Sequence, residues 1–459
     1  MIISSFVFKE LQAITGKAYC KRDKEDLACY AYDAITRDAF PGLVVFPADT
    51  HDVSEILKVA FREKIPVVPR GSGSGTTGGS LAVAGGIVMV MNRLSRIIHI
   101  DRDNVIARVE PGVITGDLHR AVEREGLFYP PDPSSSDFST LGGNLAECAG
   151  GPRAVKYGVT KDYVIGLTAV LPSGEIIKTG VKTAKGVVGY DLTRLITGSE
   201  GTLAVVTEMT LKLLPLPPCV KTMSVVFESM DTAARTVSDI IRSGIIPRCV
   251  EYLDKASIDC ALSYSNIEIP KTAEALLIIE TDGREEVAEQ DIRQLGELCL
   301  ANGAMEIRIA KSPEDQRQLW AARKAVSPAL YMYGPDKINE DIVVPRSKIP
   351  DMVKRIEALK KETGLTMVTF GHAGDGNMHV NIMLDKKNKD DLEKAEKAVN
   401  VIFDETLALG GTLSGEHGVG ITKSAYISKE IGSVELDLMR KIKRVFDPDN
   451  ILNPGKIFY

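Results

Sequence analysis

The residues best suited to chemistry lie in two short glycine-bracketed stretches near the end of the chain. "FGHAGDGNMHV" (370–380) contains His372 and His379, and "SGEHGVG" (414–420) contains Glu416 and His417. Three of the chain's six histidines therefore lie in these two motifs. Imidazole and carboxylate groups are ligands that zinc and manganese accept in proteins. The pattern predicts a metal site, and the alternative is that these histidines only stack or hydrogen-bond at a glycine-rich surface.

A predicted β-hairpin would bring the two histidines of the first stretch together. "GLTMVTFGHAGDGNMHVNIML" (364–384) reads as two strands joined by a glycine turn. Alternation along the second strand gives Met378, Val380 and Ile382 one face, so His379 and Asn381 share the other. The turn would return His372, near the end of the first strand, toward His379.

The composition excludes several classes of protein. The 459-residue chain is 44% hydrophobic and 26% charged, with a net charge of −6, which indicates no binding to nucleic acid or to an anionic membrane surface. No stretch reaches the roughly 20 apolar residues of a membrane span. Its seven cysteines are scattered, with no C-x-x-C pair, which argues for a reducing compartment and against an iron–sulfur cluster or a cysteine–zinc site within this chain. We expect a soluble, cytoplasmic protein.

The order of predicted elements indicates an α+β fold in three parts. Strands and helices alternate over the first 215 residues, and "LPLPPC" (214–219) is a strong linker signal. The middle part alternates again, as in a sheet covered on one face. We therefore expect boundaries at 1–216, 217–410 and 411–459.

Two glycine-rich stretches in the first part are suited to a phosphate-containing ligand. "PRGSGSGTTGG" (69–79) directly follows a predicted strand, and glycines let backbone N–H groups converge on a phosphate. No G-K-[ST] follows and no helix opens at its end, so it is neither a P-loop nor the dinucleotide fingerprint. In "STLGGNLAECAGGPRAVKYGVTKDYV" (139–164) glycines alternate with small residues, which fits a large planar ligand. A flexible loop is the alternative for the first stretch.

Together with "TGSEGTLAVVTEMTLKLLP" (197–215), these stretches resemble the flavin domain of the vanillyl-alcohol oxidase / p-cresol methylhydroxylase superfamily over roughly residues 40–215. The resemblance implies FAD between two α+β subdomains, with its pyrophosphate on the first stretch. Residues 69–79 contain no histidine, which favours non-covalent FAD. The implied cofactor contacts are Arg70, Gly71, Ser72, Gly73, Ser74, Thr76, Pro133, Ser134, Thr140, Gly142, Gly143, Asn144, Ala149, Gly150, Tyr157, Gly158, Val164, Glu200, Gly201, Val206 and Asn453.

The histidine motifs, with the terminal "FDPDNILNPGKIF", resemble the FAD-dependent D-2-hydroxy acid dehydrogenases over nearly the whole chain beyond residue 40. The resemblance implies a cap domain with an antiparallel sheet at 217–410 and a C-terminal segment returning to the flavin site. It also implies a divalent metal, zinc or manganese, and a set of site residues. These are His372, His379 and Glu416 as metal ligands, His417 as catalytic base, and Arg323 and Asn381 as substrate contacts.

The implied reaction is oxidation of a small D-2-hydroxy acid to the 2-oxo acid, with D-lactate as first choice and glycolate as second. In "KINEDIVVP" (337–345) Asn339 stands where members acting on hydroxyglutarate have a lysine, which favours a monocarboxylate. Electrons would pass to an iron–sulfur subunit, an electron-transfer flavoprotein or a diffusible carrier, and the sequence leaves a homodimer open. The alternatives are a D-2-hydroxyglutarate dehydrogenase, a transferase resembling alkyl-dihydroxyacetone-phosphate synthase, and a non-catalytic flavin subunit.

Overall fold

The first sheet forms around the strand that leads into the glycine-rich stretch. In the computed structural model, which describes residues 3–35, 39–264 and 268–458, three strands pair in parallel and a fourth joins antiparallel at one edge. Their order is β1 (Cys20–Lys21), β2 (Leu43–Val45), β4 (Ile87–Val90) and β3 (Val67–Arg70). Helices α1 (Ser5–Thr15) and α3 (Thr50–Glu63) pack on its core. The glycine-rich stretch therefore starts at the carboxyl end of a parallel strand, where backbone N–H groups are free to face a ligand.

A second, antiparallel sheet follows in the same unit. Its order is β5 (Ile97–Asp101), β6 (Ile106–Val109), β10 (Val205–Lys212), β8 (Val164–Val170) and β9 (Ile176–Gly180). A short pair joins β7 (Leu127–Phe128) to β11 (Leu214–Pro215). The remaining helices here are α2 (Lys24–Ala28), α4 (Thr115–Arg124), α5 (Leu141–Glu147) and α7 (Leu192–Ile196).

The end of the chain returns to this unit. By compactness the chain divides into a first unit of Met1–Gly150, Val159–Leu216 and Glu416–Tyr459, and a second of Gly151–Gly158 and Pro217–Gly415. After α14 (Ile427–Glu430) and α15 (Ser433–Phe446), Leu452 forms a parallel bridge with Val67 of β3. Asp447 fixes this crossing, because its carboxylate accepts bonds from the backbone N–H groups of Ile451 and Leu452.

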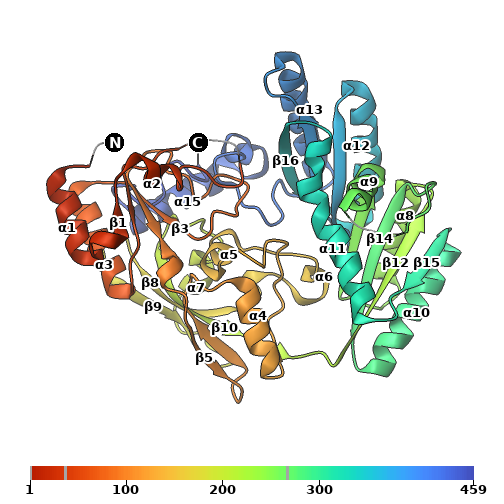
Figure 1. Ribbon diagram of the computed structural model, residues 1–459, viewed down its shortest axis with the longest axis horizontal. Helices are drawn as coiled ribbons and strands as arrows, with labels where there is room; N and C mark the ends of the chain where they lie inside the picture. The colour runs from red at the N-terminus through yellow and green to blue at the C-terminus, as the bar shows by residue number, and fades with distance from the viewer. Residues whose placement is uncertain (1–2, 36–38, 265–267, 459) are drawn as a thin grey trace. The chain divides into compact units, whose positions relative to one another are not determined.

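The second unit is built on a seven-stranded antiparallel sheet, green to blue in Figure 1. Its order is β15 (Glu306–Ile309), β12 (Cys219–Phe227), β14 (Ala275–Gly283), β13 (Cys249–Asp254), β17 (Thr366–His372), β18 (Asn377–Leu384) and β16 (Asp336–Val343). Strands far apart in the sequence thus become neighbours, and β16 pairs with β18 rather than with the strand that follows it.

Helices cover both faces of this sheet, which corrects the expectation of a sheet covered on one face. Helix α10 (Glu285–Ala301) lies on the face that carries Thr281, whose hydroxyl donates to Ala288 O. Helices α8 (Met230–Arg242), α12 (Ile349–Thr363) and α13 (Lys389–Ala408) pack with α10 or with one another. Helices α9 (Lys255–Tyr264) and α11 (Pro313–Ala329) share a core with Leu253, Ile278 and Phe370 on the opposite face. The short α6 (Ala154–Tyr157) belongs to the same unit and contacts β13.

Among the described residues, none of the helices combines the length and apolar composition needed to span a bilayer. All seven cysteines are free thiols.

Candidate active site

The predicted hairpin is confirmed, and it brings the two histidines together. Phe370 of β17 is paired with His379 of β18, and the rings of His372 and His379 lie 5.2 Å apart between centroids. Directly paired residues point to the same side of a sheet. His372, His379 and Asn381 therefore lie on the face that α9 and α11 cover, and all three are buried.

A third strand adds an acid that the sequence motifs did not indicate. Register pairs Asp341 of β16 with His379, and Asp341 Oδ1 lies 3.5 Å from His379 Nδ1. The fully buried Asp341 carboxylate also accepts bonds from Asn377 Nδ2 at 2.6 Å and from the backbone N–H of Gly415 at 2.9 Å. The Asp341 carboxylate therefore stands beside one ring nitrogen of His379, a position from which a carboxylate can limit the orientation of a metal-binding imidazole.

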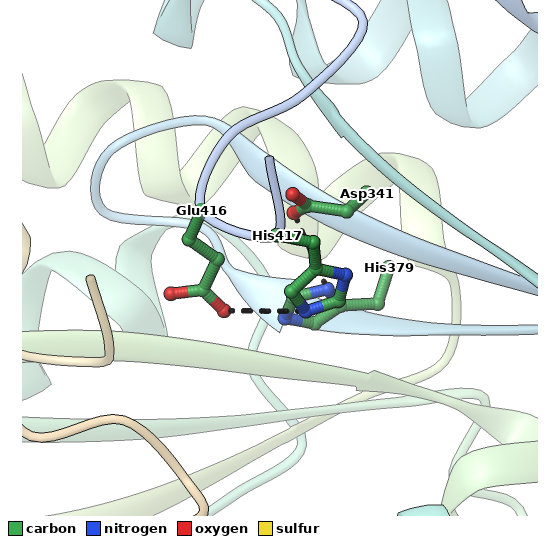
Figure 2. Close-up of side chains that lie close together, drawn as sticks. All are labelled: Asp341, His379, Glu416 and His417. Carbon is green, nitrogen blue, oxygen red and sulfur yellow. Dashed lines mark ion pairs between the residues drawn. The ribbon is translucent and has the colours of Figure 1, made fainter. Parts of the chain in front are cut away.

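Glu416 and His417 come next in the chain after Gly415, so the Gly415 bond to Asp341 keeps them close to this strand. Figure 2 shows the resulting group, in which Asp341, His379, Glu416 and His417 each offer a ligand atom within 4.8 Å of the others. His417 Nε2 lies 3.9 Å from Glu416 Oε1. Two imidazoles and two carboxylates are a donor set that fits zinc or manganese.

His372 lies beside this group but makes a different contact. Its Nδ1 lies 2.5 Å from Oε1 of Glu251 on β13, and Oε2 of the same carboxylate accepts a bond from Arg323 Nε at 2.8 Å. Burial favours a raised pKa for Glu251, but the charges of His372 and Arg323 outweigh it and hold the pKa below its usual value. Glu251 is therefore the ionised partner of both residues. The assignment of His372 as a metal ligand stays a prediction.

The predicted substrate contacts lie on the same face of the sheet. Helix α11 begins with a capping box of Ser312 and Asp315, and Arg323 on this helix is buried with its guanidinium 4.7 Å from the centroid of Phe370. Glu251 contacts Arg323 through Nε and Nη2, which leaves Nη1 for a second carboxylate. Asn381 is fully buried, and its amide is engaged by Asn339 and by the backbone of Val368.

Lys337 also lies on this face, two residues from Asn339 along β16. Its Nζ lies 3.4 Å from Ser327 Oγ, and burial lowers the pKa of the amine. Alternation along β16 places Lys337, Asn339 and Asp341 on the same face of the sheet. The Lys337 amine is therefore on the same face as the candidate metal ligands.

In the first unit, the two glycine-rich stretches meet. A Cβ on Gly71 would lie 2.2 Å from Thr140 Oγ1, and Ser72 Oγ donates to Phe138 O at 2.6 Å. The hydroxyl of Thr76 is buried without a hydrogen bond to any described residue. A backbone approach that excludes side chains, with an unpartnered buried hydroxyl, is the arrangement that an anionic cofactor would complete.

Glu416 and His417 lie against these stretches. A Cβ on Gly150 would stand 2.9 Å from Glu416 Oε2, and Thr77 Oγ1 donates to the backbone carbonyl of His417 at 3.0 Å. The stretch 414–420, which contains Glu416 and His417, is therefore bonded to the stretch 69–79, which is predicted to hold the cofactor pyrophosphate.

The other predicted cofactor residues are distributed over several elements. Asn453 Nδ2 donates to the backbone carbonyls of Gly79 and Glu200, and Gly201 follows in a turn of positive φ. Tyr157 and Gly158 belong to the second unit, where the Tyr157 hydroxyl donates to Asp282 Oδ2 at 2.7 Å. Arg70 and Ser74 lie in the first stretch, Pro133 and Ser134 precede α5, Gly142, Gly143 and Asn144 lie on α5, Ala149 follows it, and Val164 and Val206 lie on β8 and β10. Their contacts with a cofactor stay predictions.

Two buried glutamates stand next to the turn that follows His417. Burial raises the pKa of Glu147 well above its usual value, and the charge of Glu200 raises it further. Burial also raises the pKa of Glu200, but the backbone N–H groups of Val419 and Gly420 oppose this shift. We therefore assign the proton of the pair to Glu147.

Replacing Glu147 by glutamine should increase the stability of the variant relative to that of the wild type as the pH rises. The raised folded-state pKa means that the stabilisation from protonated Glu147 is complete below the unfolded-state value of about 4.3 and is lost as the pH rises through the folded-state value. Glutamine stays neutral throughout. The Tm of Glu147→Gln minus that of the wild type should grow between pH 5 and pH 8 in thermal melts, and a constant difference would contradict the assignment. Glu208→Gln, which changes a partly exposed partner of Arg108, is the control.

Three acids at or near the site were missed by sequence reasoning. Asp341 and Glu251 lie in the strand-like stretches "EDIVV" and "CVEYLD", where an acid among apolar residues was the signal available. Glu147, in the second glycine-rich stretch, carried no comparable signal.

Two family models match the chain. The model for the FAD binding domain matches residues 41–180, and the model for the C-terminal domain of FAD linked oxidases matches residues 216–457. The glycolate oxidase subunit GlcD of Bacillus subtilis is 44% identical over 458 residues, which cover 100% of this chain and 97% of that protein. The D-lactate dehydrogenase of Anaerostipes hadrus is 37% identical over 93% of this chain and 91% of that protein.

Solved structures share the fold at lower identity. A p-cresol methylhydroxylase with bound substrate has a TM-score of 0.81 at 18% identity, covering 98% of this chain and 96% of that chain. An alkyldihydroxyacetonephosphate synthase has a TM-score of 0.75 at 20% identity, covering 98% and 86%. The α+β architecture, with a flavin domain of the p-cresol methylhydroxylase type and a C-terminal domain on a large antiparallel sheet, is thereby confirmed.

Proposed function

Because this chain belongs to the FAD-linked oxidases of the vanillyl-alcohol oxidase / p-cresol methylhydroxylase family and is an oxidoreductase of the glycolate oxidase and D-lactate dehydrogenase type, we propose that it oxidises a small D-2-hydroxy monocarboxylate. D-Lactate is the first candidate and glycolate the second. The product is the corresponding 2-oxo acid.

The observation that carries this proposal is the grouping of ligand atoms from Asp341, His379, Glu416 and His417 within 4.8 Å of one another. The backbone of His417 is in turn bonded to Thr77 of the first glycine-rich stretch. Oxidation of the 2-hydroxyl group to a carbonyl requires removal of a proton from oxygen and a hydride from carbon. Bound FAD supplies the hydride acceptor, and a divalent metal, when bound, stabilises the developing alkoxide.

The residues of this chain would divide the remaining tasks. Arg323 binds the substrate carboxylate through Nη1, the nitrogen that Glu251 does not contact. His379 and Glu416 bind the metal, with His372 as a further predicted ligand, and Asp341 orients His379. His417 accepts the hydroxyl proton while the hydride leaves C2, so that the substrate loses one proton and one hydride, which together are two electrons and two protons.

The electron acceptor is a second part of the proposal. The seven cysteines are free thiols scattered over the sequence, and a two-electron oxidation must be followed by reoxidation of the flavin. The Bacillus subtilis relative is named as a subunit. We infer that a partner protein, an iron–sulfur subunit or an electron-transfer flavoprotein, accepts the electrons.

Anaerobic titration tests the substrate assignment. Purified protein is mixed without oxygen with D-lactate, L-lactate, glycolate or D-2-hydroxyglutarate, and flavin absorbance near 450 nm is followed. We expect D-lactate to bleach the flavin fastest, glycolate more slowly, and L-lactate and D-2-hydroxyglutarate poorly. Faster reduction by D-2-hydroxyglutarate would reassign the substrate to a dicarboxylate and Lys337 to its second carboxylate. Bleaching by none of the four would overturn the proposed function.

A further inference from the structure

Glu200 lies under the turn that follows His417, and it binds that turn through both carboxylate oxygens. Oε1 accepts from the backbone N–H of Val419 at 2.8 Å, and Oε2 accepts from the N–H of Gly420 at 2.7 Å. Glu200 is 5% exposed and lies at a positive φ of 52°, a conformation that is unfavourable for an L residue. A backbone strained at a non-glycine residue points to a constraint from the surrounding structure.

The surroundings of Glu200 make this contact rigid. Its own N–H donates to Ala146 O at 2.8 Å, and its carbonyl accepts from Asn453 Nδ2 at 2.8 Å. The backbone on both sides of the side chain is therefore fixed to the same unit. Two charge-assisted bonds to adjacent amides resemble the contact of a bound anion, and they are stronger than neutral hydrogen bonds.

The turn itself has little room to move. Gly418 and Gly420 both have positive φ, and a Cβ on Gly418 would stand 3.0 Å from Glu200 Oε1. The N–H of Ile421 donates to Thr77 O at 2.8 Å, and Thr77 Oγ1 donates to His417 O at 3.0 Å. The backbone at His417 is thus held through its own carbonyl on one side and through the amides of Val419 and Gly420 on the other.

We propose that Glu200 is a positioning residue, which fixes the backbone at 419–420 so that the His417 imidazole stands ready to accept the substrate proton. The inference rests on the proposed function of His417. It differs from the cofactor contact expected for Glu200 from the sequence, because both carboxylate oxygens are already used by the turn. A displacement of about 1 Å at a reacting group can cost on the order of 100-fold in rate.

The test compares Glu200→Ala and Glu200→Gln with Glu208→Gln as the matched control. Hydrogen–deuterium exchange of the peptide covering 415–421 is measured in the resting protein, followed by FAD content, apparent KM and the rate of flavin reduction under anaerobic D-lactate. Glu200→Ala should speed exchange in this peptide, keep FAD and KM near wild type, and slow reduction on the order of 100-fold. Glu200→Gln, which keeps one acceptor oxygen, should fall between Glu200→Ala and the wild type.

Each other outcome is decisive. Unchanged exchange in both variants would show that Glu200 does not hold the turn at 419–420. Loss of FAD with unchanged exchange would show that Glu200 is a cofactor contact. Faster exchange with normal flavin reduction would show that Glu200 stabilises the turn but does not position His417 for the reaction. If no hydroxy acid reduces the flavin of the wild-type protein, only the proposed function is overturned. The exchange measurement needs no substrate, so it still shows whether Glu200 holds the turn. If Glu200→Ala does not fold, Glu200→Gln carries the same readouts.

Discussion

Replacing His417 by alanine should slow flavin reduction by D-lactate on the order of 10²–10⁴-fold, the usual range for loss of a general base. FAD should remain bound, because the bond of Thr77 to the 417 carbonyl uses the backbone rather than the imidazole. Substrate affinity should change little, since Arg323 is untouched. Anaerobic stopped-flow spectroscopy measures the rate, and substrate deuterated at C2 shows whether hydride removal is the affected step.

Two neighbouring variants separate proton transfer from metal binding. His379→Ala and Glu416→Ala should lower the zinc or manganese content of the resting protein in elemental analysis, because a ligand binds metal whether or not substrate is present. His417→Ala should keep most of the metal. If His417→Ala loses the metal while Glu416→Ala retains it, the two roles must be exchanged. Normal flavin reduction in His417→Ala would place the base elsewhere.

The local parts of this site could be predicted from sequence because their signals are local. Alternation along 377–384 was enough to put His379 and Asn381 on one face of a strand, and the glycine turn returned His372 toward them. Likewise, Ser312 and Pro313 at the start of α11 are a local signal of a helix N-terminus. Periods of two and 3.6 residues are set within one element, so they need no knowledge of the fold.

The missed residues depend on pairing between distant strands. Asp341 meets His379 only because β16 pairs with β18, and Glu251 meets His372 across 121 positions of sequence. Periodicity assigns a residue to a face but does not say which strands are neighbours. The expectation that the sheet is covered on one face was wrong for a related reason. Helix α9 (Lys255–Tyr264) is not among the elements predicted from the sequence, and periodicity does not say which face of a sheet a helix covers.

The role of Glu200 illustrates a different limit. Its motif, "TGSEGTL", correctly indicated the flavin family, but membership in a motif does not say what a side chain contacts. The carboxylate turns toward Val419 and Gly420, more than 200 positions away along the chain. Sequence alone therefore left the partner of the Glu200 carboxylate undetermined.

Substituting valine for Gly73 should abolish retention of FAD. Gly73 has a φ of +71°, which a β-branched residue rarely adopts, and a Cβ there would lie 2.2 Å from Arg70 Nη2. Arg70 has little freedom to retreat, because Nη2 donates to Tyr32 O at 2.7 Å and the side chain is buried. The backbone strain alone is about 1–2 kcal/mol, which corresponds to roughly a tenfold loss of affinity for a cofactor that requires this loop geometry.

Gly75 provides the matched control for this experiment, since a Cβ there would meet no atom within 4 Å and its φ is not positive. Gly75→Ala should purify yellow with the wild-type ratio of absorbance at 450 and 280 nm. Gly73→Val should purify nearly colourless with an unchanged far-UV circular dichroism spectrum. Acid precipitation of the wild type should leave the yellow colour in the supernatant, because residues 69–79 contain no histidine for a covalent bond. If Gly73→Val retains FAD as tightly as Gly75→Ala, the pyrophosphate does not lie on this loop, and the phosphate-binding backbone must be sought in the stretch 139–150 that Gly71 contacts through Thr140.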